Sequence, residues 1–357
     1  MHKILILSNS LRGLILTREE LIIRLMNNYK VVLLCKVDTS VEFLSNEITV
    51  YDWDLDRLSL GIFNNLKGIL TLLTIIIKER PLKCISFTIK PNVYFGFVRT
   101  FFKVQWIAVI TGLGRHFYRD DILSKIIRFL LVTFTLSAKY ILFENHNDML
   151  TFSNNKVKKN MVVMNGAGVN LDKFLFIERK YQKKLSFLYS ARISKDKGIE
   201  ELLYMIELLK INKIDHDFVL IGEMEEAYKD QIEKLSLLKL LRYDGFINNV
   251  LPYYYNCDAL IMPSHHEGLP NVILEASSCG RPVISSDIPG SNSIIVDGYN
   301  GFLFSKGSVE ELYDSILKFS SLSFSQRKEL GINARKIVEE RFGRELVVDK
   351  YINLLER

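Results

Sequence analysis

Two glutamates, Glu267 and Glu275, lie in one stretch whose residue types could hold a small polar ligand. The stretch follows the apolar run 259–262, which predicts a buried strand, and it continues into a helix predicted to start at Pro270 and to end at Gly280. Glu267 would then lie in a loop beyond the carboxyl end of a strand, and Glu275 in the second turn of the helix. Carboxylates accept hydrogen bonds from sugar hydroxyls, and a helix N-terminus binds phosphate. The pattern therefore indicates a nucleotide sugar as ligand.

A pair of cations lies at a second predicted junction between a strand and a helix. Arg192 and Lys197 follow the strand expected at 187–190 and precede the helix expected at 199–210. Arg192 offers a planar fork of donors and Lys197 a compact charge, so the two could converge on a diphosphate. Taken alone, either the glutamates or the cations could be solvated surface residues. Their occurrence in the same half of the chain favours a ligand site.

Six stretches of this half, in order between about residues 160 and 305, resemble the retaining glycosyltransferases of family 4, which have the two-domain GT-B fold. The resemblance implies that Arg192 and Lys197 hold the diphosphate of the donor. It further implies that Glu267 bonds the sugar hydroxyls and Glu275 the ribose. The stretches are Ser190 to Gly198, Leu220 to Glu223, Asp244 to Phe246, Glu267 to Glu275, Gly280 to Ile284 and Asp297 to Gly301.

The same resemblance assigns further residues to the donor. Loops near Gly222 and at Phe246 and Ile247 would border the nucleotide. Around the start of the predicted helix, Leu269, Pro270 and Asn271 would lie along the phosphates, and Gly268 before them is a further donor-binding residue.

The first half matches the family less completely. Family members often carry a Gly-Gly pair after the first strand, whereas this chain has a single Gly13, which weakens the case for a phosphate contact there. Where many members have a histidine before a glycine, this chain has Thr111 before Gly112, a pattern shared with related capsule and O-antigen enzymes. We therefore place Thr111 and Gly112 with Gly13 in the active cleft and assign no catalytic base. His116 is a candidate for acceptor contact, although a lone histidine is more often incidental.

Length and periodicity predict an α/β protein with two Rossmann-like doubly wound domains facing across a cleft. At 357 residues the chain exceeds the length at which a single hydrophobic core keeps growing, so two domains are expected. We expect an acceptor-binding domain at 1–175 and a nucleotide-sugar-binding domain at 176–342, with the helix at about 343–357 a candidate to pack back on the first. Apolar strands alternating with helices indicate parallel sheets. The strands are expected at 3–7, 29–35, 84–88, 106–110, 187–190, 218–221, 241–243, 259–262 and 282–285.

Charge is distributed unevenly between the halves. Residues 1–175 hold 23 Lys and Arg against 14 Asp and Glu, a net charge of +9, whereas the remainder has a net charge of −3. This asymmetry predicts an anionic partner for the first half. The stretches 66–78 and 123–139 combine long apolar runs with basic residues, as helices at a membrane interface do. The alternative, that both stretches pack in the hydrophobic core instead of touching a membrane, has about even odds. No nucleic-acid motif is present, so a bilayer is the better candidate.

Other features bound the location and the chemistry. No uncharged run is long enough to span a bilayer, and the N-terminus lacks the pattern of a signal peptide, so we expect a cytoplasmic protein that associates peripherally with the inner membrane face. The four cysteines and six histidines show no metal-ligand spacing. We therefore predict no metal and no cofactor.

The leading hypothesis is a metal-independent retaining transferase, for a hexosyl or N-acetylhexosaminyl group, in surface polysaccharide (O-antigen or capsule) assembly. The donor is expected to be a nucleotide diphosphate sugar, UDP-linked, and the acceptor a saccharide on polyprenyl diphosphate. The alternative is a catalytically silent subunit of the same fold that binds a nucleotide or a partner. A nicotinamide-dependent dehydrogenase would need a Gly-x-Gly-x-x-Gly turn, which the first strand lacks.

Overall fold

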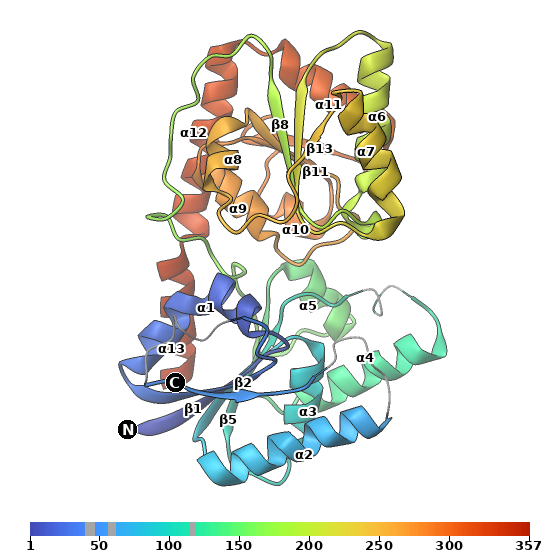
Figure 1. Ribbon diagram of the computed structural model, residues 1–357. Coiled ribbons are helices and arrows are strands. Elements are labelled where there is room, and N and C mark those ends of the chain that lie inside the picture. The colour runs from blue at the N-terminus through green and yellow to red at the C-terminus, as the bar shows by residue number, and fades with distance from the viewer. Residues whose placement is uncertain (40–46, 56–61, 115–116, 118) are drawn as a thin grey trace. The chain divides into compact units, whose positions relative to one another are not determined.

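The computed structural model describes residues 1–39, 47–55, 62–114, 117 and 119–357, and it divides into two compact units (Figure 1). Unit 1 comprises Met1–Ala167 and Arg344–Arg357, and unit 2 comprises Gly168–Gly343. The domain boundary expected at 175 lies beyond the observed one, because Val169 and Phe174 already pack in the hydrophobic core of unit 2.

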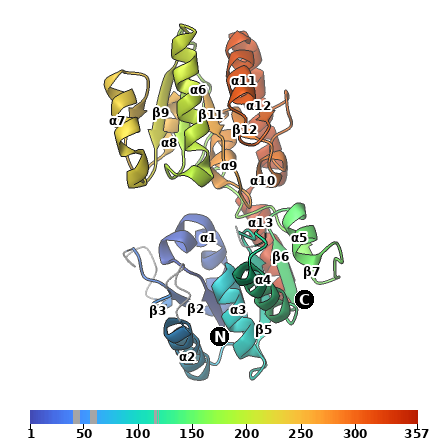
Figure 2. The same cartoon turned by 90° about the vertical axis from the view of Figure 1, so that its right-hand side faces the viewer.

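The described part of unit 1 contains a parallel sheet in the order β3-β2-β1-β4-β5-β6-β7. Alternate side chains of each strand enter cores on opposite faces, as expected for a sheet that is covered on both sides. Helices α2 to α5 cover one face, and α1 and α13 cover the other (Figure 2). The strands are β1 (His2–Leu7), β2 (Tyr29–Cys35), β3 (Thr49–Asp52), β4 (Lys83–Phe87), β5 (Gln105–Ile110), β6 (Tyr140–Phe143) and β7 (Met161–Val163). The helices are α1 (Leu11–Met26), α2 (Ile62–Glu79), α3 (Ile89–Arg99), α4 (Ile122–Thr135), α5 (His146–Ser153) and α13 (Arg344–Glu356).

Unit 2 repeats this plan with a parallel sheet in the order β10-β9-β8-β11-β12-β13. Helices α6, α7 and α11 cover one face, and α8, α9 and α12 cover the other. The strands are β8 (Ser186–Ser190), β9 (Asp217–Ile221), β10 (Arg242–Tyr243), β11 (Ala259–Met262), β12 (Val283–Ser286) and β13 (Gly301–Phe304). The α-helices are α6 (Ile199–Ile211), α7 (Lys229–Leu237), α8 (Leu251–Asn256), α9 (Asn271–Ser278), α10 (Pro289–Asn292), α11 (Val309–Ser321) and α12 (Phe324–Arg341), with short 3-10 turns η2 (Lys195–Lys197) and η3 (Glu226–Tyr228).

Each sheet has a point at which the strand order reverses. In unit 2 this point lies between β8 and β11, whose following helices α6 and α9 pack on opposite faces. In unit 1 it lies between β1 and β4, followed by α1 and α3. Ligands of open α/β sheets bind in the crevice that opens beyond the carboxyl ends of such strands. The two reversal points therefore indicate where each unit presents its loops to a ligand.

Among the helices of the described ranges, none combines the length and the hydropathy that a membrane span requires.

Candidate active site

The loops that follow β8 and β11 lie against each other at the reversal point of unit 2. Gly198 has a φ of +71°, and a Cβ atom built on it would lie 2.0 Å from the carbonyl oxygen of Pro263. Only glycine permits both that backbone conformation and that approach. The amide of His265 also donates to the carbonyl oxygen of Asp196 at 3.0 Å. The two loops are thus held together by backbone contacts.

This arrangement brings Lys197 and Glu267 together. The Nζ atom of Lys197 lies 2.6 Å from Oε1 of Glu267, and each side chain is 18% exposed. The buried Tyr189 supports the cation loop, because its hydroxyl donates to the carbonyl oxygen of Arg192 at 2.8 Å. Burial raises the pKa of Tyr189 well above its ordinary value, with a smaller contribution from Asp196, so the hydroxyl remains a donor at neutral pH.

Arg192 is more accessible than Lys197. Its Nη2 atom contacts Oδ2 of Asp196 at 3.2 Å, and its side chain is 54% exposed. Burial acts to raise the pKa of Asp196, but a hydrogen bond from Ser194 and the charges of Arg192 and Lys197 outweigh it and lower the pKa. Asp196 therefore stays ionised and orients the guanidinium, which keeps further donors available at the surface of the loop.

Glu275 lies on α9, directly after the Glu267 loop. It is half-buried and accepts a hydrogen bond from the hydroxyl of Tyr254 at 2.8 Å. Burial and the nearby carboxylate raise the pKa of the fully buried Tyr254 well above its ordinary value, so this tyrosine is a neutral donor. The helix begins at Asn271, and Pro270 at the N-cap supplies no side-chain hydrogen bond. The first-turn amides are therefore not capped by that residue.

The other predicted donor residues belong to the same edge of the sheet. Gly222, directly after β9, has a φ of +138°, and a Cβ atom on it would lie 1.9 Å from the carbonyl oxygen of Ala191. Gly222 also donates its amide to the carbonyl oxygen of Gly245, which precedes the exposed Phe246. The remaining residues lie in the loops after β10 and β11, with Ile247 half-buried, Gly268 held close to α10 through Gly290, and Leu269 buried.

In unit 1 the structure explains why the first-strand loop is a poor phosphate site. The amide of Gly13 donates to Oγ of Ser10 at 2.9 Å, and the amide of Arg12 donates to Oδ1 of Asp38 at 2.9 Å. The start of α1 is therefore occupied by an internal hydroxyl and a carboxylate, which repels phosphate. Thr111 and Gly112 follow β5 at the carboxyl edge of this sheet. His116 lies outside the described residues.

Several residues of this region carried no assignment from the sequence. Asp196 lies four positions after Arg192, a spacing that could have revealed it. Tyr189 and Tyr254 gave no signal, because their hydroxyls reach partners that only the fold brings near. His265 is a further case, since its Nε2 atom lies 2.7 Å from Oε1 of Glu201 on α6.

Residues 171–337 match the family model described as glycosyl transferases group 1. The matched residues make up most of unit 2. Among curated proteins, the chain is similar to the capsular polysaccharide biosynthesis glycosyltransferase CapM of Staphylococcus aureus, with 26% identity over 308 residues that cover 81% of this chain and 80% of CapM. It is also 26% identical over 272 residues to an N,N'-diacetylbacillosaminyl-diphospho-undecaprenol alpha-1,3-N-acetylgalactosaminyltransferase of Campylobacter jejuni, covering 70% of each.

Solved structures agree with this chain in fold. Sucrose-phosphate synthase of Thermosynechococcus elongatus matches with a TM-score of 0.84 at 15% identity, covering 100% of this chain and 98% of the synthase. The Anabaena protein HepE, in complex with UDP and glucose, matches with a TM-score of 0.81 at 16% identity over 100% of both chains. The predicted resemblance to this family and the predicted α/β class with two Rossmann-like units, the GT-B fold, are confirmed.

Proposed function

We propose that the chain transfers a sugar from a UDP-linked donor to a hydroxyl of a saccharide acceptor, with retention of anomeric configuration. The observation that carries the proposal is the contact of Lys197 with Glu267 at the reversal point of the unit 2 sheet. A cation for the diphosphate and an acceptor for sugar hydroxyls lie side by side there, and Glu275 follows on the next helix.

The cations supply the electrostatic part of the chemistry. When the bond between the anomeric carbon and the phosphate oxygen breaks, negative charge develops on the departing diphosphate. The ammonium group of Lys197 has three N–H donors, so it can keep its hydrogen bond to Glu267 and still donate to a phosphate oxygen. Arg192 adds a second cation from the accessible side of the loop. Both would stabilise the transition state more than the ground state, and this scheme needs no divalent metal.

The carboxylates orient the donor. Glu267 retains acceptor capacity beyond its contact with Lys197 and would bond hydroxyls of the transferred sugar. Glu275, fixed by Tyr254, would bond the ribose hydroxyls. The departing phosphate would take the proton of the attacking hydroxyl on the same face, so that attack and departure share one side of the sugar ring.

The acceptor is proposed to bind unit 1. At the reversal point of its sheet, Asn9 lies in the loop after β1 and Thr88 directly follows β4. Thr88 has a φ of +71°, which is rare for a β-branched residue and is typical of functional sites. Oδ1 of Asn9 and Oγ1 of Thr88 are buried without a hydrogen-bond partner among the described residues. A polyhydroxylated acceptor would satisfy both atoms.

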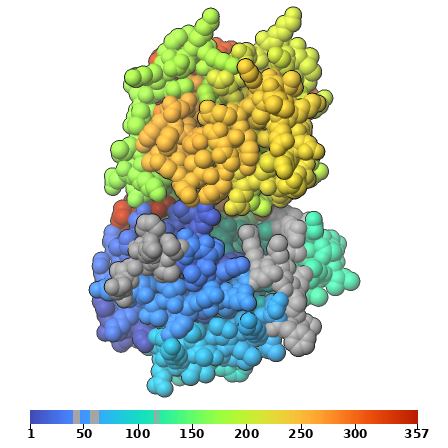
Figure 3. All heavy atoms as spheres, in the orientation of Figure 1, coloured from blue at the N-terminus to red at the C-terminus, as the bar shows by residue number. Residues whose placement is uncertain are grey.

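A lipid-linked acceptor accounts for the surface of unit 1. The Campylobacter relative is named for an undecaprenol-diphosphate-linked substrate, and CapM for capsule biosynthesis. On α4, Ile122, Ile126 and Phe129 share one face and are 78%, 49% and 67% exposed. Leu66 and Leu70 likewise lie exposed on one face of α2, whose surface is partly visible in Figure 3. Exposed apolar rows on a unit with excess positive charge favour peripheral binding to an anionic membrane.

The decisive experiment incubates the purified protein with a panel of nucleotide sugars and a detergent-solubilised polyprenyl-diphosphate saccharide. We expect transfer from one UDP sugar, and the NMR coupling constant of the new linkage should report the same anomeric configuration as the donor. An inverted product would contradict the retaining mechanism. Binding of UDP without transfer or hydrolysis of any donor in the panel would favour a catalytically silent protein.

A further inference from the structure

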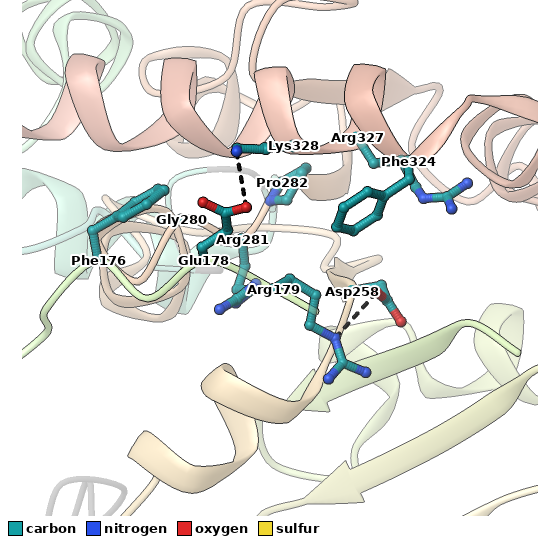
Figure 4. A pocket seen from close by; sticks show the side chains of 10 residues that line it. All are labelled: Phe176, Glu178, Arg179, Asp258, Gly280, Arg281, Pro282, Phe324, Arg327 and Lys328. Atoms are coloured by element: carbon teal, nitrogen blue, oxygen red, sulfur yellow. Dashed lines mark hydrogen bonds and ion pairs between the residues drawn. The ribbon is translucent and has the colours of Figure 1, made fainter. Parts of the chain in front are cut away.

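A positively charged recess lies at the opposite edge of the unit 2 sheet from Lys197. It is formed where β11 and β12 begin, next to Asp258 and Pro282, and its walls come from the segment 176–179 and the first turns of α12 (Figure 4). Its empty space is about 370 Å³, part of it open to solvent. None of its lining residues belongs to the loops of the proposed donor site.

Only part of the positive charge in the recess is neutralised. The lining includes four cationic side chains and two carboxylates. Nε of Arg179 lies 3.2 Å from Oδ1 of Asp258, and Nζ of Lys328 lies 2.8 Å from Oε1 of Glu178. Figure 4 marks both pairs with dashed lines. The two carboxylates are thus matched with two of the four cations.

The other two cations contact neutral groups. Arg327 donates to the carbonyl oxygen of Leu322, and Nη2 of Arg281 donates to that of Ile177 at 2.5 Å. Arg281 is only 1% exposed, and its Nε atom has no hydrogen-bond acceptor among the described residues. Asp258 is the carboxylate that acts on Arg281, but it is already paired with Arg179. A buried guanidinium with an unused donor is costly unless a further group completes it.

Two buried thiols next to Arg281 do not supply that counter-charge. Burial raises the pKa of Cys257 and that of Cys279 to about 12, which outweighs the opposing effect of Arg281 itself. Both thiols are therefore neutral at pH 7. The cations that line the recess therefore still outnumber its two carboxylates.

We propose that this recess is a binding site for a small oxyanion of the phosphate class. Nε of Arg281 would donate to one oxygen, and Arg327 and Lys328 would face the anion from α12, since guanidinium groups and lysines together recognise phosphate by direct hydrogen bonds and by charge. Occupancy would link the segment 176–179 to α12. The site is separate from the donor chemistry and does not depend on the proposed function.

The test titrates sodium phosphate into the protein in an isothermal calorimeter at constant ionic strength, with UDP present at saturation to fill the donor site. We expect saturable binding of one phosphate per chain, and no binding of chloride. The double variant Arg327→Gln, Lys328→Gln removes accessible charges while it retains the buried Arg281, so it should fold. It should bind phosphate at least about ten-fold more weakly, which corresponds to about 1.4 kcal/mol. Lys336→Gln, an exposed change on the same helix, should leave the affinity unchanged.

A second double variant distinguishes phosphate binding at the recess from phosphate binding at the donor site. Phosphate binding at the recess should persist in the double variant Arg192→Ala, Lys197→Ala when it is measured without UDP. The proposal fails if phosphate binding is lost in that variant but retained in the Arg327, Lys328 variant, or if phosphate binds no better than chloride. Thermal unfolding with and without phosphate gives an independent readout, because a ligand of the folded state raises the Tm.

Discussion

Replacing Lys197 with alanine is expected to lower turnover by about 10²-fold or more while leaving the protein folded. The ammonium group is the cation that the structure places next to Glu267, and both side chains are largely shielded from water. In such a setting a charge acts on a developing diphosphate with less screening than it would in bulk water. Loss of one such stabilising donor costs about 2.7 kcal/mol or more of transition-state stabilisation.

The substitution also has a cost in the unbound protein, because Glu267 loses its partner. Leaving a half-buried carboxylate unpaired should lower the free energy of unfolding by about 1 to 3 kcal/mol. This effect is separable from catalysis, since a variant that is folded at the assay temperature reports only the loss in turnover. Lys195→Ala is the matched control: Lys195 lies in the same turn, but it is 73% exposed and pairs with Glu200 instead.

The assay is the rate of UDP release at saturating donor and acceptor, with folding checked by thermal unfolding. Lys197→Ala should lose about 10²-fold in kcat, whereas Lys195→Ala should stay within about two-fold of the unaltered protein. Near-normal kcat in a folded Lys197→Ala protein would refute the phosphate assignment. Equal losses in both variants would show that general charge near the loop, rather than the placement of Lys197, carries the effect.

Four further predictions follow from the same structure. Glu267→Gln should chiefly lower kcat and Glu275→Gln chiefly raise the KM for the donor, and the reverse pattern in steady-state kinetics would overturn their assigned roles. Incubation with EDTA should leave turnover within about two-fold, and a loss restored by Mg²⁺ would contradict the metal-independent scheme. Co-sedimentation of the protein with vesicles should require anionic lipid and weaken at high salt. The double variant Lys125→Glu, Arg128→Glu should bind less, because each basic residue contributes about 1 kcal/mol of attraction to the anionic surface. Equal binding to neutral and anionic vesicles would contradict the membrane association. Gly198→Ala should lower the free energy of unfolding by more than about 1 kcal/mol in chemical denaturation, because its φ is +71° and the new Cβ meets Pro263; an unchanged value would show that the two loops tolerate separation.

Strands with strong apolar runs were predictable from local sequence. The run 259–262 coincides with β11, and 3–7 lies within β1. Short strands at or near the sheet edges were missed, among them β3, β7 and β13, because a few residues carry little periodic signal. β6 was missed for another reason: it directly follows the apolar stretch 123–139, which has no composition change to mark the transition.

The sequence by itself indicated the family resemblance and the α/β class, and it singled out the four residues that we propose bind the donor. Arg192, Lys197, Glu267 and Glu275 were named from their types and from their positions after predicted strands, since a strand followed by a helix places the intervening loop at the carboxyl edge of a parallel sheet. Local patterns also showed that the first strand lacks a Gly-Gly turn.

Only the tertiary structure decided which of these groups touch. Lys197 and Glu267 are 70 positions apart, and they meet because β8 and β11 are neighbours in the sheet although two strands separate them in the chain. The hydrogen bond of Tyr254 to Glu275 and the buried Nε of Arg281, which lacks an acceptor among the described residues, have the same origin. Strand order and burial are set by packing across the whole unit, so contacts between distant residues are not recorded in any local pattern of the sequence.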